Sequence, residues 1–138
     1  MQADLIGYLR TLTGLAARLG AHNTRPAIDW NVRPSPATLP ALTIQTISPG
    51  NAYDQETVNA VKETRIQFDL WADSYADARL AEIKLAEGLH AISNTAQGDT
   101  VFIRALKDSD RDLGAIDEPG GLTVHHIAVD WIIYNRPA

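Results

Sequence analysis

One stretch near the middle of the chain, residues 63–92, changes from the pattern of a β-strand to that of an α-helix within a few residues. It reads ETRIQFDLWADSYADARLAEIKLAEGLHAI. Ile66, Phe68, Leu70 and Ala72 alternate with more polar positions, which is the period of two expected of a strand with one buried face. The pattern predicts a strand over residues 63–73 that turns directly into a helix.

That helix is predicted over residues 75–94. Ser74 can accept a hydrogen bond from a backbone N–H of the first turn, and Asp77 follows three residues later, as in a capping box. An apolar stripe with helical spacing would face the core, while Arg79, Glu82 and Glu87 lie outside the stripe. The stripe comprises Ala78, Ala81, Leu85, Leu89 and Ile92.

The start of the chain predicts another helix, over residues 2–20. Its apolar residues recur at spacings of four and three, and Gly20 can end the helix. The stripe is Leu5, Leu9, Leu12, Ala16 and Leu19. A leucine stripe can mediate dimerisation, but in one short helix packing on the chain's own core is the favoured interpretation.

Further strands are predicted on both sides of the central unit. After a proline-rich segment in which only AIDWNV suggests a short extended piece, β-branched residues predict a strand over 41–48. Trp30 in that piece is interpreted as covering the edge of the core rather than as an interface anchor. A long, mobile loop is expected over 49–62, and strands are expected over 100–107 and 121–134.

Between the last two strands, KDSDRDLGAIDEPGG is interpreted as a charged loop. The closing strand is apolar on both faces, which is typical of a central, covered strand. These elements predict one α+β domain over residues 1–138. Its sheet would be mostly antiparallel or mixed, with about four strands and two helices on one face.

Composition limits the function. Seventeen acidic residues against twelve Lys and Arg give a net charge of −5, which is the wrong sign for a protein that binds nucleic acid through phosphates. The chain has no cysteine, so thiolate catalysis and disulfides are excluded. The first residues lack the pattern of a signal peptide, and no apolar run is long enough to span a membrane, so we expect synthesis in the cytoplasm.

The strongest candidates for chemistry are His125, His126 and Asp130. Adjacent residues of a strand point to opposite faces, so the two histidines are poorly placed to share a metal ion. His126 and Asp130 would lie on one face, where cross-strand hydrogen bonds are the favoured interpretation. The acidic loop lacks the spacing of a calcium loop. We therefore expect no catalytic residue, no metal and no cofactor, and favour a binding or structural role over an enzyme.

Taken in order, the segments resemble the tail-terminator, or tail-completion, proteins of long-tailed bacteriophages and phage-like particles. The resemblance is carried by LIGYLRTL, LPALTIQTIS, RIQFDLWADSYADARLAEIKLAEGLHAI, DSDRDLG and HHIAVDWIIYN, which together extend over nearly the whole chain. The central segment, a strand ending in Trp-Ala followed by a helix rich in Ala, Leu and Glu, is the most specific.

This resemblance implies a virion protein that forms a ring, usually a hexamer, at the head-proximal end of the tail. The ring would cap the tail tube, stop its polymerisation and join the tail to the head connector. Its partners would be further copies of itself, the tail tube protein and the neck protein. DNA would pass through without tight binding, since six copies at −5 would carry −30 around the channel.

Within such a ring, one surface of each subunit must meet a different surface of the next. Trp71, Tyr75 and Arg111 are the residues we predict at this contact, and Tyr53, Asp54 and Glu56 are predicted to touch the tube. The alternatives are a head-tail connector (stopper) or minor tail protein and, remotely, a small metal-dependent hydrolase that uses His126 and Asp130.

Overall fold

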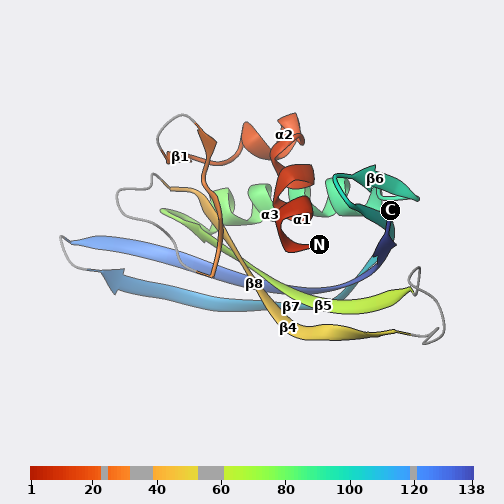
Figure 1. Ribbon diagram of the computed structural model, residues 1–138. Coiled ribbons are helices and arrows are strands. Elements are labelled where there is room, and N and C mark those ends of the chain that lie inside the picture. Colours follow the sequence, from red (N-terminus) through yellow and green to blue (C-terminus); the bar gives the residue numbers. More distant parts are fainter. Residues whose placement is uncertain (23–24, 32–38, 53–60, 119–120) are drawn as a thin grey trace.

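A computed structural model of the 138-residue chain describes residues 1–22, 25–31, 39–52, 61–118 and 121–138. One face of a curled β-sheet is covered by helices, and the other face is not (Figure 1). The sheet has six strands in the order β3-β4-β5-β8-β7-β6, and a further two-stranded sheet joins β1 and β2. The helices are α1 (Gln2–Arg10), α2 (Thr13–Ala16) and α3 (Tyr75–His90). The strands are β1 (Ala21–His22), β2 (Arg25–Pro26), β3 (Ile28–Trp30), β4 (Ala41–Ala52), β5 (Lys62–Ala72), β6 (Thr95–Gln97), β7 (Thr100–Glu118) and β8 (Leu122–Pro137).

The α+β class is confirmed, but the sheet has more strands than the four expected. It is mixed, because β3 pairs in parallel with β4 while the other neighbours are antiparallel. The short extended piece in the proline-rich segment supplies β3, and Trp30 packs partly buried against the core. The described residues form three helices where two were expected.

The junction between β5 and α3 forms as its sequence predicts. Ile66, Phe68 and Leu70 are fully buried beneath the helices. The Ser74 hydroxyl accepts a hydrogen bond of 3.2 Å from the backbone N–H of Asp77, so the helix begins with a side-chain cap. The expected stripe of α3 is buried, and the prediction that Glu82 lies outside it is wrong, since Glu82 is only 4% exposed.

The opening helix is interrupted, which corrects the prediction of one helix over 2–20. Residue Thr11 ends α1, where its hydroxyl donates a hydrogen bond of 2.6 Å to the carbonyl of Tyr8. The short α2 then packs against α3. Leu12 lies so close to Gly88 that a side chain at position 88 would force Leu12 to shift. The break lets Leu5 and Leu9 face the sheet while Leu15 is buried in the next helix.

The largest correction concerns residues 107–121, which were expected to form a charged loop. Instead β7 continues to Glu118 and pairs antiparallel with β8 from Thr100↔Pro137 to Glu118↔Leu122. Three register shifts bend this pair along its length. A loop was inferred because the segment is polar; its polar side chains are instead the outward and edge positions of a strand.

Residues 49–62 were expected to be a mobile loop. Pairing of β4 with β5 extends to Ala52↔Lys62, so both ends of that segment belong to strands. Residues 53–60, which include Tyr53, Asp54 and Glu56, lie outside the described part of the chain. The closing strand β8 lies between β5 and β7, as expected of a central strand.

Candidate assembly surface

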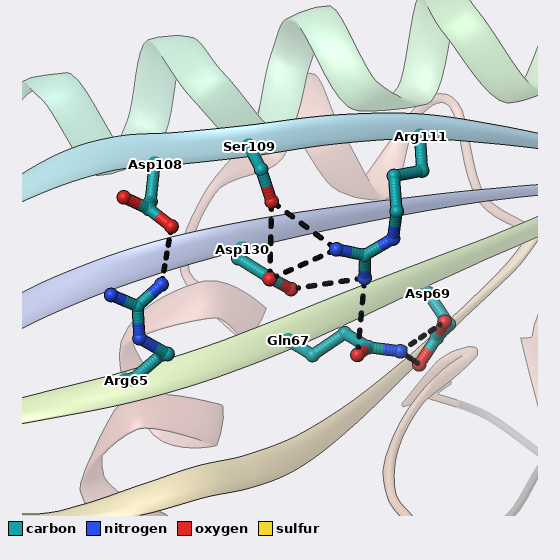
Figure 2. A network of polar contacts seen from close by, with 7 residues as sticks. All are labelled: Arg65, Gln67, Asp69, Asp108, Ser109, Arg111 and Asp130. Carbon is teal, nitrogen blue, oxygen red and sulfur yellow. Dashed lines mark hydrogen bonds and ion pairs between the residues drawn. The ribbon is translucent and has the colours of Figure 1, made fainter.

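The face of the sheet that the helices leave uncovered carries paired polar side chains from three neighbouring strands, in one larger group and one separate ion pair (Figure 2). They occupy the outward positions of β5, β8 and β7, opposite the buried residues described above. Seven of them are Arg65, Gln67, Asp69, Asp108, Ser109, Arg111 and Asp130. We call this set the outer-face network.

Its centre is the pairing of Arg111 on β7 with Asp130 on β8. The two terminal nitrogens of Arg111 donate hydrogen bonds of 3.1 and 3.3 Å to the two oxygens of Asp130. Ser109 donates a third, of 3.1 Å. Asp130 is 8% exposed, so these donors replace the water that its carboxylate loses. The hydrogen bond to Asp130 raises the pKa of the Arg111 guanidinium above its usual value.

Gln67 on β5 links this pair to a second buried carboxylate. Its side-chain oxygen accepts a hydrogen bond of 3.3 Å from Arg111, and its nitrogen donates one of 2.9 Å to Asp69. Asp69 is 6% exposed and lies 2.7 Å from Nε2 of His126 on β8. The polar chain therefore runs across β7, β8 and β5 without a gap.

Beside this chain, the ring of His126 stacks on Trp71, with the ring centroids 3.8 Å apart and an interplanar angle of 12°. The indole nitrogen of Trp71 donates a hydrogen bond of 3.0 Å to Thr43 on β4. At another position, Arg65 pairs with Asp108, and this hydrogen bond raises the pKa of Arg65. The uncovered face is thus held rigid by contacts between four successive strands.

A second ionic cluster ties β7 to the helical layer. Glu82 and Asp110 are held by two cations, since Lys107 lies 2.9 Å from Glu82 and 3.0 Å from Asp110, and Arg79 lies 2.8 Å from Asp110. Burial alone would raise the pKa of the Asp110 carboxyl, but hydrogen bonds from Lys107 and Arg79 outweigh burial and lower it. This cluster fixes the position of β7 relative to α3.

The residues predicted at a subunit contact are divided between these two groups. Trp71 and Arg111 both belong to the uncovered face, where Gln67 and Asp69 connect them. Tyr75 is in the first turn of α3 and is 45% exposed; its hydroxyl accepts a hydrogen bond of 3.2 Å from Arg79. It therefore belongs to the cluster on the helical side.

His126 and Asp130 both make cross-strand contacts, which is the interpretation that was favoured for them. His126 pairs across the strands with Asp69, and Asp130 pairs with Arg111, so the two do not form a joint site. Within the described residues, no three His, Asp or Glu side chains gather in a way that could hold a metal ion. Sequence reasoning missed Gln67, Asp69 and Ser109; the strict alternation of β5 was the signal that placed the first two beside Trp71 on one face.

None of the helices in the described ranges is long and apolar enough to cross a membrane.

Comparison with known proteins gives a similarity among solved structures. No protein-family model matches the chain, and no curated protein matches it. Among solved structures, the chain is similar to one in the virion of a native gene transfer agent particle, with a TM-score of 0.59 and 18% sequence identity. The match covers 99% of this chain and 93% of the other, so it includes the uncovered face and the whole helical layer. At this identity, the similarity establishes a shared fold.

Proposed function

We propose that this chain is a structural protein of a tailed virion or a virion-like particle, without catalytic activity. The observation that supports it best is the nearly full-length structural similarity to a chain of a gene transfer agent virion. A shared fold alone does not assign a role. Here the fold agrees with the resemblance to tail terminators, which rests on the order of segments in the sequence and not on the structure.

Within such a particle, we propose that copies of the chain form a ring, most simply a hexamer, that caps the tail tube. The ring would end tube polymerisation and connect the tail to the neck at its head-proximal end. Assembly through preformed surfaces needs little reordering, and the rigid outer-face network supplies such a surface. Trp71, Tyr75 and Arg111 remain the residues proposed for the subunit contact, and Tyr53, Asp54 and Glu56 remain those proposed for the tube contact.

The test is end-specific binding. Purified protein is added to assembled tail tubes of the same particle and to tube subunits that are still polymerising, and both are observed by negative-stain electron microscopy. The proposal predicts density at one end of each tube and an arrest of elongation at substoichiometric protein. Binding along the sides of the tube, or no effect on tube length, would favour the connector or minor tail alternative.

A further inference from the structure

The distal part of the β7–β8 hairpin extends beyond the helical layer, at the left of Figure 1. We call residues 112–118 and 122–125 the arm. Its base is fixed, because Arg79 pairs with Asp110 and Arg111 pairs with Asp130 immediately before the arm begins. His125 still pairs with Ala72 on β5, and beyond this position the arm is a two-stranded ribbon with an anchored base.

The arm presents both apolar and acidic groups to solvent. Leu113 is 49% exposed and Ile116 is 46% exposed, although a two-stranded ribbon gains little stability from exposed apolar side chains. The arm has three acidic residues, including Asp112 and Asp117, and no Lys or Arg. Asp112 accepts a hydrogen bond from the backbone of Gly114, and Asp117 accepts one from Thr123. These donors are neutral, so the negative charge of the arm is not cancelled by them.

On the other side of the molecule from the arm, toward the right of Figure 1 where the C-terminus lies, there is a groove of about 520 Å³. Two cations and one carboxylate line it: Lys62, Arg136 and Asp99. Within the described residues, neither Lys62 nor Arg136 is in an ion pair; Arg136 donates only to the backbone of Pro137. The wall also includes Met1, Ala3 and Pro137, which are apolar. The groove and the arm therefore both have apolar surface, and the charges of the two are of opposite sign.

We propose that the arm of one copy docks in the groove of the next copy, an inference that rests on the proposed ring. An arm and a groove on different sides of one chain make a heterologous contact, which is the kind that generates rings. With a net charge of −5 on each chain, copies of the chain repel one another overall. The pairing of an acidic arm with a cationic groove selects one relative orientation against that background.

Disulfide trapping tests this docking, because the natural chain has no cysteine. Ile116→Cys marks the arm and Ala3→Cys marks the groove, and both leave every charge in place. Ile83→Cys is the matched control, since Ile83 is 44% exposed but lies on α3. Equimolar mixtures of two single-cysteine proteins are oxidised, and the mixed disulfide is followed over time.

We expect the Ile116→Cys and Ala3→Cys pair to form the mixed disulfide at least about tenfold faster than the Ile83→Cys and Ala3→Cys pair, through a raised local concentration. Asp117→Lys on the arm protein should slow it severalfold, and Lys62→Glu on the groove protein should restore the rate. Equal rates for the two pairs, both without tail tubes and with them, overturn the docking. A fast Ile116–Ala3 cross-link that forms only after tail tubes are added supports the docking and means that the ring closes on the tube.

The docking and the proposed function fail in different ways. A ring that caps tubes without the Ile116–Ala3 cross-link leaves the capping function standing and removes the docking. A fast cross-link in a protein that binds no tube end supports the docking and removes the capping function.

Discussion

Arg111 on β7 holds Asp130 on β8 through two hydrogen bonds on the face of the sheet that no helix covers. Asp130 is 8% exposed, so its charge depends on this partner rather than on water. The pair connects the base of the arm to the centre of the sheet. A substitution of Arg111, which is proposed for the subunit contact, would therefore also change the stability of the fold.

The first prediction concerns the contribution of this pair to the stability of the fold. Arg111→Ala should lower the melting temperature, because Asp130 then keeps only the Ser109 hydroxyl among its side-chain partners. The double variant Arg111→Ala with Asp130→Asn should recover part of the loss, since the unpaired buried charge is gone. Thermal unfolding followed by circular dichroism measures both. No recovery in the double variant would mean that Asp130 does not need the cation.

The second prediction concerns the buried carboxylate on α3. Glu82 lies 2.9 Å from Lys107, and its side chain is 5% exposed. Glu82→Ala should lower the free energy of unfolding by about 1–3 kcal/mol. The loss is smaller than for a fully buried ion pair, because Lys107 is partly solvated. Glu87→Ala is the control on the same helix, where the side chain is 61% exposed, and it should cost less than about 0.5 kcal/mol. Equal losses in urea denaturation would show that burial of Glu82 is unimportant.

The third prediction follows from the lowered pKa of Asp110. A carboxyl whose pKa is lower in the folded state binds fewer protons there, so it adds stability above its ordinary pKa. That contribution is lost as the pH falls from its ordinary pKa, near 4, toward the lower folded value.

Asp110→Asn should consequently lower stability at neutral pH and flatten the loss of stability on acidification below about pH 4. Urea midpoints measured from neutral pH to about pH 2 give the two slopes. Parallel curves for the two proteins would contradict the assignment of Lys107 and Arg79 as the groups that lower this pKa.

A fourth prediction concerns two glycines with positive φ. Gly98 has φ +57, and a side chain there would come within 2.1 Å of Asp4, whereas Gly114 has φ +77 and open space around it. Both changes to alanine force an unfavourable backbone, at about 1 kcal/mol each. Gly98→Ala should cost more, because it also displaces the Asp4 carboxylate that accepts a 2.7 Å hydrogen bond from Thr100. Equal melting temperatures for the two variants would contradict this.

The sequence predicted the elements whose side chains have a plain period. The alternation of β5 and the capped start of α3 were correct because a half-buried strand and an amphipathic helix impose periods of 2 and 3.6 on their residues. The strand β8 was placed in the middle of the sheet because both its faces are apolar.

What could not be predicted depends on partners that are distant in sequence. Asp108 and Arg111 are typical of a loop until they are seen beside Arg65 and Asp130 on other strands. The break at Thr11 likewise depends on the space that Gly88 leaves for Leu12. The order of segments led to the resemblance with tail terminators, but no local pattern indicated that the charged segment is a bent strand with an exposed arm.

If copies of this chain close into a ring on a tail tube, the mass of the purified protein should show it. Light scattering after size exclusion, over a series of concentrations with and without tail tubes, gives that mass, and negative-stain images give the shape. A ring would give particles of about six 15.0 kDa subunits with a central hole, either free or at one end of the tube. A monomer at every concentration that is not recruited to tube ends would contradict it.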